Sequence, residues 1–346
     1  MKKYHGIEIL RFFTSISVLI YHYRHFFAPY NSSSNLNYFD ISSSLPFYNF
    51  LGLIYEHGIF GVHVFYTISG FVFAHIYLSN QEKIPAKSFF KNRFARLYPL
   101  HFFTLILVCI LQFYSHLKFD TFQIIEINDI YHFFLNILFI SSWGFENGHS
   151  FNAPIWSVSV EIAIYIIFFL LLSLIKKFKI FFVVLLSLLL LIIDKSEIYD
   201  TLFLECARLF FSGTLIYYLF HIKLNNLYYI ISALFFLLIA FIGNFKTFIF
   251  CPALLLFFVS IDTYIKSESY QLFFKKLGNL TYSLYLLHLP VQIILLILFK
   301  QLQISELVFT NVIFFILFFV LLIFIANYCF KYYEKPLNEL LRNKIK

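Results

Sequence analysis

Apolar stretches alternate with short polar segments from one end of this chain to the other. Most of the stretches are long enough to form a helix that crosses a bilayer, which takes about 20 residues. They fall at 7–27, 58–79, 98–115, 131–143, 156–175, 178–193, 201–221, 226–243, 247–265, 281–299 and 307–330. This pattern predicts an all-α, polytopic membrane protein with one integral membrane domain over residues 1–346.

The basic residues of the loops indicate which stretches cross. The stretch at 131–143 is the shortest, at about 13 residues. If it does not cross, every basic segment falls on the side of the amino terminus: 83–96, 176–179, 275–276 and the residues after 330. Because basic loops stay in the cytoplasm, we expect about ten transmembrane helices with both termini cytoplasmic. Residues 131–155 would then hold a short re-entrant or extracytoplasmic helix, and 28–57 an external loop.

Composition and charge narrow the class of protein further. The chain is 61% hydrophobic and 13% charged, whereas soluble domains carry about 25% charged residues. We attribute the net charge of +8 to loops that fix orientation in the membrane, and not to nucleic-acid binding. The four cysteines lie far apart in apolar stretches, so they form no disulfide or metal motif.

Two ionisable residues, Arg11 and His22, lie in the first apolar stretch, eleven positions apart. That step turns an α-helix about 20° past three full turns and advances it by about 16 Å, so both side chains share a face. Ionisable groups at membrane depth are costly and usually face a protein interior or a water-filled cavity. The pair predicts the wall of a site. Taken singly, each residue could instead be a packing histidine or a snorkelling arginine.

Polar residues also mark the second and third stretches. His63 and Ser69 lie in the second, where Ser69-Gly70 indicates close packing of helices. Arg93 and Arg96 precede the third and lie one turn apart if that segment is helical. Two guanidinium groups at the membrane edge suit a ligand that carries phosphate, or else the headgroups of lipids.

A proline opens the stretch that begins near residue 156. Pro154 predicts a helix that starts near Trp156, and Ser157 and Glu161 are four residues apart, on one face of that helix. Glu161 is a second ionisable group that we expect to face protein or a cavity. Its alternative role is that of a structural hydrogen-bond acceptor.

The tenth stretch opens with Tyr282 and carries His288 two residues before Pro290. A proline within a membrane helix frees a backbone carbonyl, which neighbouring polar groups then satisfy. We therefore expect His288 to lie at a kink with freed carbonyl groups.

Together these motifs resemble the acyltransferase-3 family of integral membrane acyltransferases. They occur in family order over nearly the whole chain: Arg11 with His22, Phe65 to Gly70, Arg93 with Arg96, Trp156 to Glu161, Tyr282 to Pro290, and Glu334 with Pro336. The chain departs from the family pattern in two places. His63 stands where many members carry an acidic residue, and Tyr66 replaces a Phe.

The resemblance implies O-acylation of a glycan or lipid-linked sugar in the bacterial plasma membrane. Acyl-CoA, most simply acetyl-CoA, would be the co-substrate, with no permanently bound cofactor and no metal. His22 would act as general base or transient acyl carrier, assisted by Arg11 and Glu161, while Arg93 and Arg96 would hold the phosphates of the donor. The expected lining residues are His63, Ser69, Trp156, Ser157, Tyr282 and His288.

Two other functions fit part of the pattern. Ionisable residues in membrane spans also mark transport paths, so a transporter or flippase for a glycolipid or an anion is the main alternative. Transporters often contain internal repeats, and the helix with Arg11 and His22 has no counterpart in the second half. A haem or metal protein could use intramembrane histidines, but His22, His63, His75 and His288 lack the short spacings of metal ligands.

Overall fold

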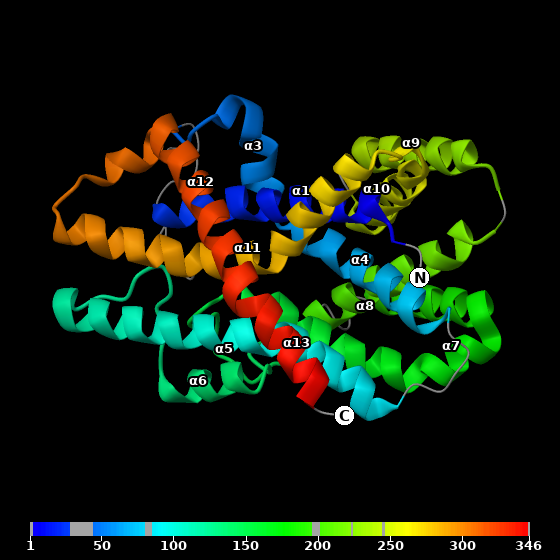
Figure 1. The fold of residues 1–346 in the computed structure, drawn as a ribbon, viewed down its shortest axis with the longest axis horizontal. Coiled ribbons are helices and arrows are strands. Elements are labelled where there is room, and N and C mark those ends of the chain that lie inside the picture. The colour runs from blue at the N-terminus through cyan, green and yellow to red at the C-terminus, as the bar shows by residue number, and fades with distance from the viewer. Residues whose placement is uncertain are drawn as a thin grey trace. The chain divides into compact units, whose positions relative to one another are not determined.

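The computed structural model describes residues 3–27, 44–79, 85–195, 201–222, 224–243 and 246–344. These residues form helices and no strand (Figure 1), so the all-α prediction is confirmed. The helices are α1 (His5–Tyr23), α3 (Tyr48–His57), α4 (Phe60–Tyr77), α5 (Ala86–Phe119), α6 (Ile130–Ile137), α7 (Ile155–Lys195), α8 (Leu202–Phe220), α9 (Asn226–Ile242), α10 (Thr247–Ile261), α11 (Glu268–Gln301), α12 (Val312–Cys329) and α13 (Lys335–Lys344), with short helical turns at 24–26, 262–264, 306–310 and 330–334.

Seven helices of the described chain are long and apolar enough to cross a membrane. They are α4, α5, α7, α8, α10, α11, and α12 together with its continuation into α13. The polytopic membrane class is therefore confirmed, while the count of about ten stays a prediction. α9 is an apolar helix of 17 residues, and α1 has 19 residues that include Glu8 and Arg11.

α7 contains an interruption in the place where the apolar pattern breaks. Lys179 has φ 50° and ψ −135°, a conformation outside the α-helix, and positive φ is uncommon for a residue with a side chain. This residue lies at the start of the second of the two apolar stretches 156–175 and 178–193, which the sequence predicts as separate helices. α7 begins at Ile155, beside the predicted start at Trp156.

The short helix expected within 131–155 is α6. Its eight residues are too few to span a bilayer, and its first turn is capped by Asp129, whose carboxylate accepts a hydrogen bond from the backbone N–H of His132. Ile130, Phe134 and Leu138 are exposed, and their spacing of four residues makes one apolar outer face. Of the predicted external loop 28–57, residues 28–43 lie outside the described part, and the remainder includes α3.

The chain forms two compact units. Unit 1 consists of residues 1–15, 59–86 and 160–279, and unit 2 of residues 16–58, 87–159 and 280–346. In unit 1, α4 and α8 pack backbone to backbone. A Cβ atom on Gly70 would lie 1.7 Å from the carbonyl oxygen of Phe210, and one on Gly213 would lie 1.9 Å from that of Thr67. The close packing predicted at Ser69-Gly70 is therefore confirmed.

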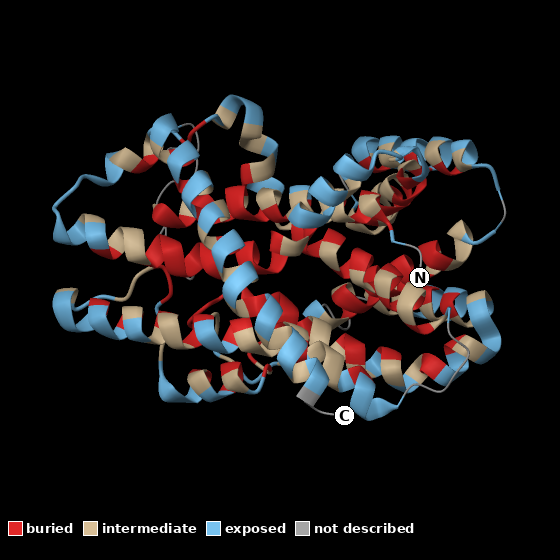
Figure 2. Cartoon of the chain, viewed as in Figure 1, coloured by how far each residue is buried: buried red, intermediate tan, exposed pale blue. Residues whose placement is uncertain are grey.

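Unit 2 is organised around the second half of α11. Residues 280–293 of this helix are buried without interruption (Figure 2). Their apolar side chains join a core with α5 and the segment before α7, which includes Leu105, Val108, Ile125, Leu289 and Ile293. A helix that is buried on all sides can present polar groups only to other protein groups or to a ligand.

Candidate functional site

A pair of buried histidines forms the polar centre of unit 2. His22 Nδ1 lies 2.8 Å from His288 Nε2, and the two side chains are 2% and 1% exposed. Gln292, one turn after His288, donates a hydrogen bond of 2.9 Å from Nε2 to the carbonyl oxygen of His22. α1 ends at Tyr23, and the last carbonyl groups of a helix lack partners within it. α11 therefore holds both the ring and the backbone of His22.

The hydrogen bond between the two rings places the proton of one imidazole on the nitrogen that faces the other. Which ring donates depends on the tautomers of the pair.

Three further basic residues surround this pair, and the sequence analysis missed them. The ring centroid of His25 lies 5.3 Å from that of His22, and Arg24 and His149 interact electrostatically with His22. The spacing of three between His22 and His25 could have signalled a shared helical face. His149 lies in the loop before α7, where no periodic pattern exists to place it. Burial lowers the pKa of His149 below its ordinary value.

Pro290 frees a carbonyl group beside His288, as predicted, but α11 continues through the proline. A proline has no N–H to donate to the residue four positions earlier, which here is Leu286. The amide nitrogen of Asn152 donates to that carbonyl oxygen at 3.0 Å and lies 3.0 Å from the hydroxyl of Thr104. Asn152, fully buried, thus replaces the missing helical hydrogen bond.

The predicted lining residues Trp156, Ser157 and Tyr282 lie where other helices meet α11. The Ser157 hydroxyl is 2.7 Å from that of Tyr285, which in turn donates to the carbonyl oxygen of Pro154 at 2.9 Å. Tyr282 donates to the backbone of α5, at the carbonyl oxygen of Leu97 (2.6 Å). The ring of Trp156 lies 6.3 Å from that of His149. These contacts position the start of α7 and the middle of α5 against α11.

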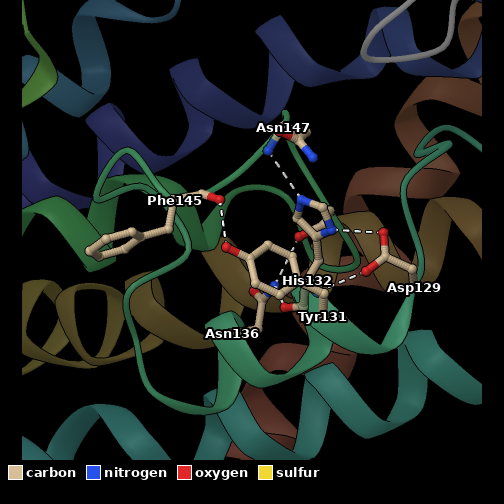
Figure 3. Close-up of polar contacts among 7 residues, drawn as sticks. Asp129, Tyr131, His132, Asn136, Phe145 and Asn147 are labelled. Atoms are coloured by element: carbon tan, nitrogen blue, oxygen red, sulfur yellow. Dashed lines mark hydrogen bonds and ion pairs between the residues drawn. The ribbon is translucent and has the colours of Figure 1, made fainter.

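The loop that carries His149 is fastened to α6 (Figure 3). His132 Nδ1 lies 2.7 Å from the Asp129 carboxylate, and the backbone N–H of Asn147 donates to His132 Nε2 at 3.1 Å. Tyr131 donates to the carbonyl oxygen of Phe145 at 2.9 Å. Although burial acts to raise it, the hydrogen bonds from His132 hold the pKa of Asp129 below its usual range. The loop is therefore fixed at two points before it reaches His149.

Unit 1 contains the other predicted ionisable residues. The Arg11 guanidinium lies 3.3 Å from the Glu8 carboxylate, and both side chains are partly exposed. His63 Nε2 lies 3.1 Å from a carboxylate oxygen of Glu205. An acidic group thus stands beside position 63, supplied by α8 and not by α4. Glu205 is an ionisable residue within the apolar stretch 201–221, a signal that could have marked it, although its partner lies some 140 residues away.

The remaining residues of unit 1 include a second carboxylate group. Glu161 is half-buried on α7 and interacts electrostatically with Cys206. Arg208 forms an ion pair with Asp194, and Ser69 is half-buried on α4. In the part of the chain that the structure describes, no three His, Cys, Asp or Glu side chains converge as metal ligands would.

Arg93 and Arg96 both lie in α5, as expected from their spacing, and are half-buried. The helix places them one turn apart on one face. Lys87 and Lys91 belong to the same helix. This end of α5 therefore carries a basic surface.

These features define an all-α membrane protein in which a buried helix holds a pair of imidazole groups. Its sequence matches the profile of a family described as an acyltransferase domain over residues 4–330, and the chain belongs to that family of enzymes. Over 125 residues it is 33% identical to a curated protein of Streptomyces mycarofaciens, "Acyltransferase MdmB". That similarity covers 36% of this chain and 30% of the relative. No solved structure matches the chain.

Proposed function

We propose that this acyltransferase moves an acyl group, most simply acetyl, from acyl-CoA to a hydroxyl group of a cell-surface or lipid-linked glycan. The observation that carries the proposal is the hydrogen bond between His22 and His288, because it orients an imidazole as a base. The family match favours this enzyme activity over transport. We place the protein in the bacterial plasma membrane, with both termini in the cytoplasm.

His22 performs the proton transfer in this proposal. Its Nε2 takes the proton of the acceptor hydroxyl while that oxygen attacks the carbonyl carbon of the thioester. The C–O bond of the new ester forms, the C–S bond breaks, and the proton leaves with the thiol of CoA. His288 stabilises the protonated His22 through the hydrogen bond at Nδ1. A well-placed base typically contributes about 100- to 10,000-fold in rate.

A two-step route uses the same residues. His22 Nε2 attacks the thioester, the C–S bond breaks and CoA leaves as its thiolate; the acceptor hydroxyl then displaces the acyl group from the imidazole, and its proton neutralises the thiolate. Arg11 and Glu161, both in unit 1, stay the residues predicted to stabilise negative charge and to orient the acceptor or an imidazole.

The basic end of α5 is the proposed binding region for the donor. Arg93 and Arg96 bind the phosphate groups of acyl-CoA, because guanidinium groups form paired hydrogen bonds with phosphate oxygens. The donor therefore approaches from the cytoplasm.

The test compares surface glycans of a deletion strain that carries no copy, the wild-type gene or the His22→Ala gene. By NMR, the O-acyl ester should be lost on deletion, return with the wild-type gene and stay absent with His22→Ala. Membrane amounts of the two proteins are matched by immunoblot. An ester signal that survives deletion, or that His22→Ala restores in full, contradicts the proposal.

A further inference from the structure

A stripe of polar side chains runs along the buried part of α11. It consists of Thr281, Tyr285, His288 and Gln292, all buried. Their spacings of four, three and four residues place them on one face of a helix, whereas leucines occupy half of the intervening positions. Polar groups at membrane depth commonly line the path of a substrate.

Gln292 uses only half of its amide group within the protein. Its partner at Nε2, the carbonyl oxygen of His22, can only accept, so the orientation of the amide is determined and Oε1 points elsewhere. Gln292 is 0% exposed, and among the described residues Oε1 has no hydrogen-bond partner. Buried polar atoms almost always have a partner, so an exception of this kind requires an explanation.

Gln112 shows how a purely structural glutamine behaves in the same unit. It is 1% exposed and hydrogen-bonds at both ends of its amide. Its Nε2 donates to the carbonyl oxygen of Gln123 at 2.7 Å, and its Oε1 accepts from the N–H of Gln123 at 2.9 Å. Among the described residues, the buried amides of Asn136 and Asn152 share the unused acceptor of Gln292, but of these three amides it is Gln292 that is bonded to the backbone of His22.

We propose that Gln292 Oε1 accepts a hydrogen bond from a second hydroxyl group of the acceptor, next to the hydroxyl that His22 deprotonates. This inference rests on the proposed function and names its substrate class: an alcohol with neighbouring hydroxyl groups, as in a sugar. The position supports it, because the amide of Gln292 is bonded to the backbone of His22 itself. Gln292 is then a specificity-determining residue.

A site of this kind discriminates strongly between substrates. An enzyme that hydrogen-bonds a substrate hydroxyl rejects an analogue that lacks it, since the buried acceptor is then left without a partner. A single alcohol should therefore be a poor acceptor, and an otherwise identical diol a much better one.

The experiment uses the full chain in liposomes with acetyl-CoA, and propylene glycol or n-propanol as acceptor probes. These probes differ by one hydroxyl group. We expect wild-type protein to favour the diol by at least about tenfold in kcat/KM. Gln292→Met keeps the length of the side chain without the amide and should reduce the preference to about one, mainly through KM for the diol. Gln292→Glu, uncharged when buried, keeps an acceptor and a donor and should retain most of the preference.

Gln112→Met is the matched control and should leave the preference unchanged. Equal use of both alcohols by the wild type, or thioester cleavage with neither alcohol acylated, overturns the inference. So does an unchanged preference in Gln292→Met. If Gln292→Met does not fold, the inference is tested by the kcat/KM ratio of the wild type for the two alcohols and by the preference that Gln292→Glu retains. Absence of any thioester cleavage by the wild type contradicts the proposed function instead.

Discussion

Two buried histidines of unit 2, His22 and His132, differ in the groups that their ring nitrogens bind. His132 uses both ring nitrogens, one toward Asp129 and the other toward the N–H of Asn147, so it fastens a loop. His22 shares its Nδ1 hydrogen bond with a second imidazole, His288, and not with a carboxylate. Because both ring nitrogens of His132 hold the loop, His22 is the better candidate base of the two.

His288→Ala removes the group that orients the His22 ring. A hydrogen bond of this kind contributes about 1–2 kcal/mol, and each 1.4 kcal/mol changes a rate about tenfold, so kcat should fall roughly 5- to 30-fold. His101→Ala is the control, because His101 is also buried in unit 2 but contacts the carbonyl oxygen of Asn136. Acyl transfer by the purified variants checks this. Equal losses in both variants would show that His288 has no special role.

The sequence predicted His22 and His288 because an ionisable residue stands out within an apolar stretch. It did not reveal His149 or Glu205. Both acquire their surroundings only when distant segments meet: His149 lies in a loop without a helical period, and Glu205 lies in the apolar stretch 201–221 but has its partner on another helix. Arg93 and Arg96 could be placed on one helix face from spacing alone, but their ligand could not be read from it.

At the scale of elements, α11 shows how one proline in a helix requires a hydrogen-bond donor from another segment. Pro290 predicts a freed carbonyl group, and the structure identifies it as that of Leu286 and its partner as Asn152. The proline could be read from the sequence. The partner could not, because Asn152 lies 134 residues away from Leu286.

Asn152→Ala leaves the Leu286 carbonyl group buried without its donor. We expect a loss of about 1–3 kcal/mol in the free energy of unfolding, measured by thermal unfolding in detergent. Pro290→Ala restores the helical N–H, so the same Asn152→Ala change should cost less in that background. A cycle of the four proteins measures the coupling. Additive effects would contradict the assignment of Asn152 as substitute donor.

The α4–α8 contact makes a second element-scale prediction. Gly70→Ala places a methyl group 1.7 Å from the Phe210 carbonyl oxygen, so the helices must separate, and stability should fall by about 1–3 kcal/mol or more. Gly52→Ala is the control, because its nearest neighbour is an ordinary 3.6 Å away. In helix α3 it should be neutral or stabilise by about 0.5–1 kcal/mol. An equal fall in the melting temperatures of Gly70→Ala and Gly52→Ala would refute the packing argument.

At the scale of the whole molecule, the number of crossings depends on α7. Seven helices qualify as spans when α7 counts once. Adding α1, α9 and a second crossing by α7 gives the ten of the sequence prediction. Loop charge and stretch length supported that number, whereas α3 could not be foreseen, because the polar segment 28–57 has no apolar period long enough for a span.

If α7 crosses the membrane twice, as the ten-span topology requires, its middle lies in the cytoplasm. Lys177→Cys, exposed beside the interruption at Lys179, should resist an impermeant maleimide in intact cells and react after lysis. Asn147→Cys, in the loop before α7, should react in both. Unlabelled wild-type protein, which keeps its four cysteines, is the reference. Labelling of Lys177→Cys in intact cells would exclude the ten-span topology.

The hydrogen bond from Asn152 to Leu286 links the loop before α7 to the buried part of α11. Because a side chain replaces a main-chain donor, the loop before α7 is mechanically tied to the turn of α11 that bears His288. Whatever displaces that loop pulls on the turn that orients the base. Binding of a ligand at this loop and the proton affinity of the base would then be coupled, with no hinge between them.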